Sequence, residues 1–475
     1  MLRRQVGLTP PIPDELAQGL ARIRTEMKVP AEFPPDVLAA ADAAVTNPRL
    51  PDHDLTDLAF ETIDPEGSRD LDQAMCLQRE GDGYRVHYAI ADVAAFVTAG
   101  DPIDAEAHRR GSTFYAPDHR TPLHPPRLSE DAASLLPDRC RPAMVWDLHL
   151  DAEGRTDDFA VRRAMVRSRA MHSYADVQAG IDGGTASESI KLLAEIGPLR
   201  EQIERERGGV NLEVPEQEID TSGAAWELKF RATLPVEGWN AQISLLTGMA
   251  AARIMMYGQV GILRTLPSAD HTSLRKLHQT AKALKINWPA ECDYPEFVRS
   301  LDANQPPQAA MMNACTRLFR GAGYKAFSGG IPEDAEHAAI ASEYAHCTAP
   351  LRRLVDRYAL EICAALCADQ LVPQWVLQVL DQLPDEMDAA GRRASSYERA
   401  IIDLMEAYLL KPQLGSELSG VIVDVDNDHR TGQLIVEESA VEAKIIGTRL
   451  SLGHQVTAKL IEADPDRRLV RFELV

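Results

Sequence analysis

The residues best suited to chemistry in this chain are the three aspartates of one short stretch. In "ETIDPEGSRDLDQA", residues 61–74, Asp64, Asp70 and Asp72 fall within nine positions, and Gln73 follows them directly. In an extended segment, Asp70 and Asp72 lie on the same face with Cα atoms about 6.5–7 Å apart. The proline and glycine that follow Asp64 favour a turn that folds it back. Because convergent carboxylate oxygens suit Mg²⁺ or Mn²⁺, the stretch predicts a metal site.

Two interpretations of this acidic stretch stay open. As a metal site it could hold two ions about 3.5–4 Å apart, which would stabilise the attacking and leaving oxygens of phosphodiester hydrolysis. As a solvated acidic turn it would be one of many in a chain with 72 acidic and 50 basic residues. A calcium loop of the EF-hand type fits poorly, because the glycine and the closing glutamate are at the wrong offsets.

A second group of candidates lies in "CTAPLRR", which ends at Arg353. Pro350 suits the first turn of a helix, with one of the two preceding residues as the cap, so the helix start could bind an anion. The guanidinium groups of Arg352 and Arg353 can bind phosphate as planar forks. Without further motifs, a surface pair between Arg352 and Asp356 would be the favoured interpretation.

Several stretches in order resemble the RNase II (RNB) family of 3′→5′ exoribonucleases. The acidic stretch is similar to the family signature T-I-D-x-x-x-x-x-D-x-D-D-A, and "AIADVAAFV", "YAPD", "PPRLSEDAASLLPD" and "YAHCTAPLRRLVDRYAL" resemble its later motifs. The resemblance covers about residues 58–475. It implies a metal-dependent hydrolase, with Mg²⁺ or in its place Mn²⁺, that degrades single-stranded RNA from a free 3′ end to nucleoside 5′-monophosphates.

The resemblance also assigns roles within the acidic stretch. It implies that Asp64, Asp70 and Asp72 hold metal and that cleavage depends most on Asp72. Gln73 stands where the family has a fourth aspartate. A glutamine carbonyl can ligate Mg²⁺ but brings no negative charge, so we expect weaker binding of one ion. The alternative is a catalytically silent RNA-binding protein with the same fold.

Further roles are carried over residue by residue. Arg352 matches an arginine that assists cleavage, and Arg353 beside it is expected to bind RNA. Tyr115 matches a tyrosine that stacks on the 3′-terminal base, which suits sequence-independent degradation. Tyr174 and Glu398 resemble a tyrosine that contacts RNA and a glutamate near the catalytic pocket. Packed tyrosines and a solvated helix face are the plainer interpretations.

Two departures bear on substrate choice. The family often places two glutamates where this chain has Ala241 and Gln242, a site linked to sugar discrimination, so a nuclease that also acts on DNA is a further alternative. Within residues 415–475 the one aromatic residue is Phe472. RNA contacts there would depend on basic side chains, with few bases able to stack. These are Arg430, Lys444, Lys459, Arg467, Arg468 and Arg471.

The elements that position these residues predict an α+β fold in three parts. Residues 1–57 read as a small helical domain of two helices, "IPDELAQGLARIRTEM" and "PPDVLAAADAAVT", either a helix-turn-helix module or a packing hairpin. Residues 58–413 form a mixed RNB-type catalytic domain, with strands at "AMCLQ", "YRVHYAIADVAAFV" and "AMVWDLHL" and helices dominating from about 240 to 410. Residues 414–475 give about five short strands, an S1-like OB-fold barrel.

Composition leaves the function open. The net charge of −22 argues, taken alone, against a nucleic-acid partner, but an acidic chain can enclose a basic channel. The chain has neither an apolar run of membrane-spanning length nor an apolar stretch after its basic start. We therefore expect a cytoplasmic monomer without a membrane partner. Cys363 and Cys367 are expected to be small buried hydrophobes, and His346 a packed or hydrogen-bonded histidine.

Overall fold

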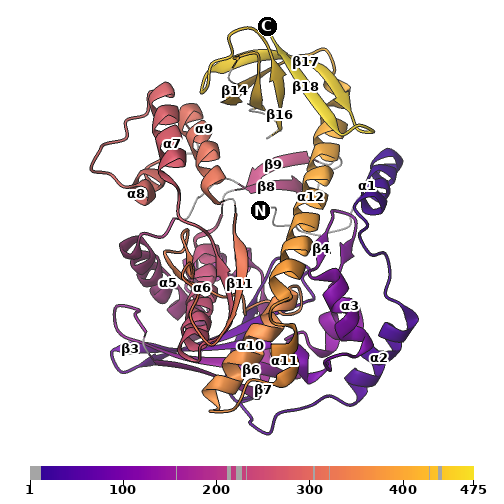
Figure 1. Ribbon diagram of the computed structural model, residues 1–475, viewed down its shortest axis with the longest axis vertical. Coiled ribbons are helices and arrows are strands. Elements are labelled where there is room, and N and C mark those ends of the chain that lie inside the picture. The colour runs from indigo at the N-terminus through magenta and orange to yellow at the C-terminus, as the bar shows by residue number, and fades with distance from the viewer. Residues whose placement is uncertain are drawn as a thin grey trace.

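The protein is described here by a computed structural model. It describes residues 12–156, 158–210, 216–220, 227–231, 233–302, 305–319, 321–426, 428–436 and 441–475. Helices and strands mix throughout the centre, and a small barrel of strands closes the C-terminal end (Figure 1). The predicted α+β class is confirmed.

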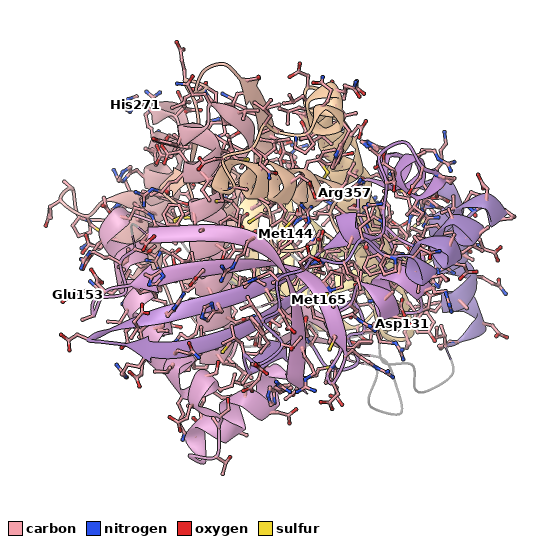
Figure 2. The ribbon with its side chains drawn as sticks, turned by 90° about the horizontal axis from the view of Figure 1, so that it is seen from below. Asp131, Met144, Glu153, Met165, His271 and Arg357 are labelled. Atoms are coloured by element: carbon pink, nitrogen blue, oxygen red, sulfur yellow. The ribbon has the colours of Figure 1, made fainter. Side chains whose placement is uncertain are left out.

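A closed five-stranded barrel forms the base of the central domain. Its strands, in the order in which they pair, are β1 (Phe60–Ile63), β2 (Gln73–Glu80), β3 (Gly83–Ala91), β6 (Cys140–Leu150) and β7 (Asp158–His172). Neighbours are antiparallel except β1 and β7, which close the barrel in parallel. Figure 2 looks onto these strands from below, with Met144 of β6 and Met165 of β7 near the middle of the view.

Helices cover the barrel and complete its core. They include α4 (Tyr174–Asp182), α5 (Glu188–Arg207), α6 (Pro235–Tyr257) and α10 (Leu354–Cys367). α6 is apolar around most of its circumference because α4, α5, α10 and a strand pack around it, as expected for a helix inside a core. Trp146 of β6 and Tyr88 of β3 are fully buried in the same cluster.

The long helix α12 (Leu383–Leu410) joins the central domain to the terminal barrel (Figure 1). That barrel has five strands in closed order, as the sequence predicts. They are β14 (Glu417–Val425), β15 (Thr431–Val436), β16 (Glu442–Ile446), β17 (Gln455–Asp464) and β18 (Leu469–Leu474). Phe472, its one aromatic residue, is fully buried, so it offers no stacking surface to a base.

The two N-terminal helices form where predicted but pack in different cores. α1 (Asp14–Glu26) packs on α12 through Leu16, Leu20 and Ile23, and α2 (Pro35–Thr46) packs on α3 (Pro102–Arg110). The expected packing hairpin is therefore wrong. Apolar faces on two short helices are buried equally well by separate partners, and helical spacing does not say which partner.

Shorter elements complete the described part of the chain. The remaining α-helices are α7 (His271–Ala283), α8 (Tyr294–Arg299), α9 (Pro306–Cys315) and α11 (Gln374–Val379). The remaining strands form two-stranded sheets: β4 (Phe114–Tyr115) with β5 (Arg120–Thr121), β8 (Glu216–Asp220) with β9 (Glu227–Arg231), β10 (Val260–Thr265) with β11 (Gly323–Ser328), and β12 (Glu336–His337) with β13 (Ser342–Glu343). None of the described helices is long and apolar enough to cross a membrane. Cys363 is buried as expected, but Cys367 is exposed, which corrects that prediction. It lies in the last turn of α10, where the helix leaves the core.

Candidate active site

The three aspartates lie in the connection between β1 and β2, at one end of the central barrel. Asp64 follows β1 directly, and its backbone N–H donates to the His172 carbonyl of β7 (3.0 Å). Asp72 immediately precedes β2. Between them, the Ser134 hydroxyl accepts from the Leu71 N–H (2.9 Å) and donates to the Arg69 carbonyl (2.6 Å). The strand ends and Ser134 thus fix the loop at both sides.

This connection forms one wall of a cavity of about 1880 Å³. The helix α12, the β4–β5 hairpin and the segment around Arg352 form other walls. Eleven of the residues singled out from the sequence line it: Asp64, Asp70, Asp72, Gln73, Tyr115, Tyr174, His346, Arg352, Arg353, Glu398 and Arg468. Lys444 and Lys459 of the terminal barrel do not line it.

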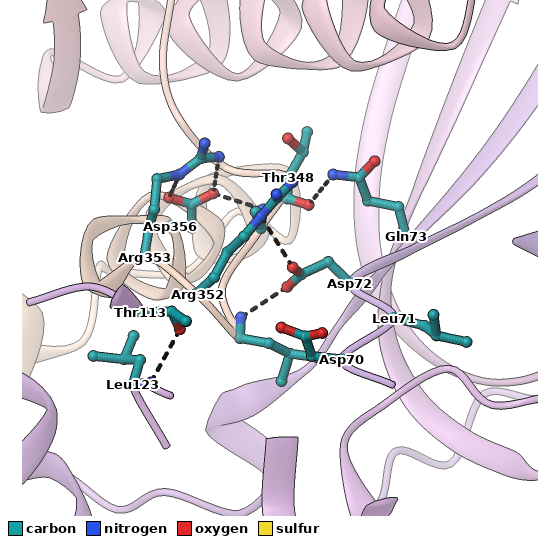
Figure 3. Close-up of polar contacts among 12 residues, drawn as sticks. Asp70, Leu71, Asp72, Gln73, Thr113, Leu123, Thr348, Arg352, Arg353 and Asp356 are labelled. Atoms are coloured by element: carbon teal, nitrogen blue, oxygen red, sulfur yellow. Dashed lines mark hydrogen bonds and ion pairs between the residues drawn. The ribbon is translucent and has the colours of Figure 1, made fainter. Parts of the chain in front are cut away.

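Asp72 is the most enclosed of the three carboxylates, and Figure 3 shows it between the Leu351 backbone and Arg352. Its Oδ1 accepts from the Leu351 backbone N–H (2.8 Å), and its Oδ2 lies 3.4 Å from Nε of Arg352. Burial raises the pKa of Asp72 well above its usual value, although Arg352 opposes the shift. The Arg352 side chain is 46% exposed, so its guanidinium is reachable from the cavity while it faces the carboxylate.

Asp64 holds an oxygen without a partner. Its Oδ2 is buried and accepts no hydrogen bond from any of the described residues. Burial raises the pKa of Asp64 to about 7; the charge of Arg352 counters this shift and that of Asp70 adds to it. A carboxylate oxygen that is buried and accepts no hydrogen bond is stabilised in its charged form by a nearby cation.

Asp70 is held by a different partner. Its Oδ1 accepts from Arg120 of β5, and the same guanidinium donates to Glu130 Oε1 (2.5 Å). Consistent with this, the described residues contain no group of three His, Cys, Asp or Glu side chains drawn close enough to hold a metal ion. The three aspartates share one cavity, but Asp70 is turned towards Arg120.

Gln73 uses both ends of its amide within the protein. Its Nε2 donates to the Thr348 carbonyl (2.7 Å) (Figure 3), and its Oε1 accepts from the Tyr88 hydroxyl (2.6 Å). An aspartate at this position could not donate to Thr348, because an ionised carboxylate only accepts. Gln73 thus links β2 to the segment that carries Arg352. Only its second carbonyl lone pair is left for a metal.

The two neighbouring arginines have different partners. Arg353 forms a bidentate pair with Asp356, with Nε–Oδ2 at 2.8 Å and Nη2–Oδ1 at 2.6 Å, and Asp356 is fully buried. Arg352 instead faces Asp72. The surface pair between Arg352 and Asp356 that spacing alone would favour is therefore wrong. Arg353 is committed to holding the segment in place, and Arg352 is the guanidinium directed at the aspartates.

The helix after these arginines begins later than the sequence predicts. α10 starts at Leu354; residues 350–352 form a turn, and Arg353 forms an isolated antiparallel bridge with Ser112. The backbone N–H groups of Ala349 and Leu351 donate to Asp356 (2.7 Å) and Asp72 (2.8 Å). The expected anion site on a helix starting at Pro350 is therefore wrong: two of the amides on which it depended already bind carboxylates of the chain.

The other candidates lie further along the cavity walls. Tyr115 is half-buried on β4, and burial raises its pKa to about 12. Tyr174 is the first residue of α4, and its hydroxyl accepts from Asn240 Nδ2 (3.2 Å). Glu398 lies on α12. These side chains come from three separate elements, which only the tertiary fold brings to one cavity.

The basic residues of the terminal barrel lie mainly on its outer surface. Lys444 of β16 is exposed and lies in register with Arg471, whereas Lys459 of β17 is exposed between Glu417 and Glu473 on the flanking strands. Arg468 is the exception among the six: it lines the cavity and pairs with Glu26 of α1 (2.6 Å). Arg467 and Arg471 both pair with Glu462.

Sequence reasoning missed Arg120, which binds Asp70. The signal was present: in the hairpin "YAPDHR", Tyr115 and Arg120 are cross-strand neighbours and so project from the same face. It also missed Arg264, whose guanidinium stacks 4.6 Å from the Tyr324 ring centroid at the cavity wall. His346 forms the expected hydrogen bond, to the Tyr324 hydroxyl (2.7 Å). Ala241 and Gln242 do not line the cavity.

Two segments of the chain match known protein families. Residues 52–368 match the RNB domain, and residues 416–475 match the RNase II-type exonuclease C-terminal S1 domain. Ribonuclease R of Escherichia coli is 26% identical over 477 residues, covering 89% of this chain; the chain spans 57% of that relative's length.

Solved structures share the fold. Mycoplasma genitalium RNase R, in complex with ribose methylated single-stranded RNA, superposes with a TM-score of 0.86 at 22% identity, covering 97% of this chain and 78% of that one. Yeast Ssd1, a pseudonuclease, superposes with a TM-score of 0.73 at 15% identity, covering 90% of this chain and 55% of that one. The same fold therefore occurs in a protein named RNase R and in one named a pseudonuclease.

Proposed function

The chain belongs to the RNB family, and on that premise we propose that it is a hydrolytic, metal-dependent 3′→5′ exoribonuclease acting on single-stranded RNA. Residues 58–413 would form the catalytic domain, residues 414–475 an S1-like RNA-binding domain, and residues 1–57 a small helical addition. The observation that carries the proposal is the cavity that the three aspartates line and in which the buried Asp72 faces Arg352. We propose a cytoplasmic monomer that acts on free RNA 3′ ends.

The residues present fit a divalent cation in their chemistry. Asp64 Oδ2 is buried without a partner, and the pKa values of Asp64 and Asp72 are both raised by burial. Hard carboxylate oxygens suit Mg²⁺ or Mn²⁺, so Asp64 and Asp72 would hold the ion. Asp70 would become a further ligand if it were released from Arg120, and so would the Gln73 carbonyl if it were released from the Tyr88 hydroxyl. A bound divalent cation would polarise the scissile phosphate and activate water.

Arg352 would act directly on the phosphate. Its guanidinium lies beside Asp72 and reaches the cavity. In a partly dehydrated site such a group stabilises the negative charge that develops on phosphate oxygens during cleavage. Hydrolysis adds water across the phosphorus–oxygen bond and releases a nucleoside 5′-monophosphate. Arg353 would support this by fixing the segment through Asp356.

Aromatic side chains would position the RNA end. Tyr115 lines the cavity on the same hairpin face as Arg120, and Tyr174 lines it from α4. A tyrosine ring stacks on any base, so contacts of this kind are independent of sequence. Glu398, which lines the cavity from α12, would contact the RNA there, and Lys444 and Lys459 would contact it at the terminal barrel.

The test uses purified protein with a 5′-labelled single-stranded RNA and Mg²⁺, with Mn²⁺ and chelator as controls. We expect products that shorten from the 3′ end to a short core and a reaction that chelator stops. A matched oligodeoxyribonucleotide should be degraded much more slowly; equal rates would overturn the RNA preference.

A silent RNA-binding protein is the second candidate. The observations favouring it are Gln73, whose amide is used inside the protein, and the absence, within the described residues, of a preassembled three-residue metal group. The same assay separates the two candidates. Clear RNA binding without cleavage in either metal would replace the exonuclease proposal with this one.

A further inference from the structure

Helix α1 lies against the hairpin that carries Tyr115, although the two are far apart in sequence. We propose that α1 contributes to the active site by holding the β4–β5 hairpin in position, and that Arg24 is the positioning residue that fixes the hairpin turn. This inference rests on the proposed function, because Tyr115 is assigned there to the RNA end. Three sets of contacts carry it.

Apolar packing fixes the strand on both sides of Tyr115. Phe114 is 1% exposed and Ala116 is fully buried, and both belong to the core that contains Leu16 and Leu20 of α1. Successive strand residues point to opposite faces. Phe114 packs edge-on against the Tyr397 ring of α12, with ring centroids 6.3 Å apart, and α1 packs on the same helix. Burial of Phe114 and Ala116 in this core shared by α1 and α12 therefore turns Tyr115 towards the cavity, where it is found.

Arg24 then fixes the turn of the hairpin. Its Nη1 donates to both carboxylate oxygens of Asp118, at 2.9 and 2.8 Å, and Asp118 lies between β4 and β5. The two side chains are only 24% and 11% exposed. Burial alone would lower the pKa of Arg24, but Asp118 and Tyr397 raise it above its ordinary value. The pair is thus charged and well shielded from solvent.

The segment after α1 is also connected to the end of strand β5. Arg110, 1% exposed, donates to the Glu32 carbonyl and to the Pro122 carbonyl, each at 3.1 Å. Its guanidinium also stacks 3.7 Å from the Phe33 ring centroid. The N-terminal segment is therefore connected to the hairpin turn directly through Arg24, and to Pro122, just after β5, indirectly through Arg110 of α3.

The hairpin is in turn connected to the catalytic residues. The Thr113 backbone N–H donates to the Arg352 carbonyl (3.0 Å), and its hydroxyl accepts from the Leu123 N–H (3.0 Å) (Figure 3). Arg120, opposite Tyr115, binds Asp70. A displaced hairpin would therefore move Tyr115 and Arg120 and disturb Arg352. Misplacement of about 1 Å in such groups can cost on the order of a hundredfold in rate.

The chain offers a matched control two residues away. Arg22 lies on the same helix and pairs with Asp466 of the terminal barrel (2.5 Å), but these side chains are 50% and 71% exposed. Exposed pairs contribute little. Arg22→Ala and Arg24→Ala thus remove the same side chain from the same helix, and only Arg24→Ala releases the hairpin.

The first measurement is hydrogen–deuterium exchange of residues 112–123 in the full chain, which requires no catalysis. We expect Arg24→Ala to speed exchange in the hairpin at least about tenfold and Arg22→Ala to leave it unchanged. Arg24→Lys, which keeps the charge but loses the planar guanidinium, should lie between them. The double variant Arg24→Asp, Asp118→Arg should restore protection. Equal hairpin exchange in both alanine variants would overturn the inference.

The second measurement joins the hairpin to RNA. An RNA with 2-aminopurine as its 3′-terminal base is bound to the Asp72→Asn protein, so that stacking is read from fluorescence quenching without cleavage. We expect adding Arg24→Ala to reduce the quenching while adding Arg22→Ala does not. In the active protein, Arg24→Ala should lower kcat/KM by about ten- to a hundredfold. If the wild type cleaves no RNA, the proposed function fails, but the exchange and quenching measurements still test the role of Arg24. Quenching that Arg24→Ala leaves unchanged would overturn the inference that Arg24 positions the hairpin.

Discussion

The cavity and the terminal barrel differ in how their charged side chains are partnered. In the cavity, Asp64 keeps an unpartnered oxygen and Asp72 has a half-exposed arginine as its counter-ion. On the barrel, Lys459 lies between two glutamates in register, and Glu462 binds two arginines. Charge left uncompensated is available to a ligand, whereas charge satisfied within the fold is not.

This difference explains why net charge is a poor guide to the partner. The chain carries −22 overall, yet the cavity brings Arg352, Arg120 and Arg264 to its walls. Residues 416–475, which match the S1 domain, hold 11 acidic and 7 basic residues, and several of these basic side chains pair with or lie beside glutamates of the same barrel. We therefore expect substitutions in the cavity to affect catalysis strongly and substitutions on the barrel to affect RNA binding weakly.

The largest expected effect is that of Asp72→Asn. It removes the buried carboxylate beside Arg352 without changing its size, and we expect cleavage to fall about a thousandfold while RNA binding changes less than about twofold. Cleavage rates and fluorescence anisotropy with labelled RNA measure the two. Asp388→Asn, on α12 at the same cavity, is the matched control. A near-normal rate in Asp72→Asn would rule out the mechanism.

The neighbouring arginines should separate catalysis from stability. Arg352→Lys keeps a charge but loses the planar fork, so kcat should fall about a hundredfold with little change in unfolding free energy. Arg353→Ala leaves the buried Asp356 without its counter-ion, which should cost about 3–5 kcal/mol of stability. Single-turnover cleavage and urea unfolding test this pair. If both variants lose mainly stability, Arg352 is a structural residue.

The pH dependence of stability should report on Asp64. Its pKa is raised from 3.8 to about 7, so the folded protein retains a proton that the unfolded chain releases between these values. The free energy of unfolding should therefore fall as pH rises through this window, by up to about 1.4 kcal/mol per pH unit for this proton. Thermal unfolding in chelator at about pH 5 to 7 measures the slope.

Two controls sharpen the Asp64 prediction. Asp64→Asn should remove that proton's share of the slope. Mg²⁺ should weaken the slope in the wild type, because it binds the deprotonated carboxylates. A slope unaffected by Asp64→Asn would show that other groups, such as Asp72, account for the pH dependence.

A smaller effect is expected from Gln73→Asp. The new carboxylate cannot replace the hydrogen bond that the Gln73 amide donates to the Thr348 carbonyl, so the metal-free protein should lose about 1–3 kcal/mol of stability. The added charge should lower the Mg²⁺ concentration needed for half-maximal cleavage severalfold. Thermal unfolding in chelator and a Mg²⁺ titration of activity measure the two effects. An unchanged titration would show that this position does not sense the ion.

The smallest effects should come from the barrel. Lys459→Ala should change RNA affinity less than about twofold, because Glu417 and Glu473 flank it. Lys444→Ala, beside Arg471, should weaken binding a little more and reduce the salt dependence of the affinity by less than one phosphate contact. Anisotropy titrations at two salt concentrations measure both. A loss above about tenfold in either variant would show that the barrel surface is a main RNA contact.

The sequence by itself determined the local features of this protein. Helical spacing of Leu16, Leu20 and Ile23 placed α1, alternating short strands placed the terminal barrel, and the spacing of the three aspartates placed the cavity loop. These features follow from contacts between residues close in sequence, or from burial patterns that repeat every two or about four residues. Order and spacing of the motifs also indicated the family.

Only the tertiary structure decided which partner each side chain meets. Arg352 and Arg353 are adjacent and chemically equivalent in sequence, yet one faces Asp72 and the other Asp356. Gln73 reaches Thr348 across 275 positions, and Arg24 reaches Asp118 across 94. No local pattern encodes such pairs, because they depend on how the barrel, the turn before α10 and the N-terminal helix pack together. The packing of these elements therefore determines which charged side chains, such as Arg352, are available to a ligand and which, such as Arg353, are paired within the protein.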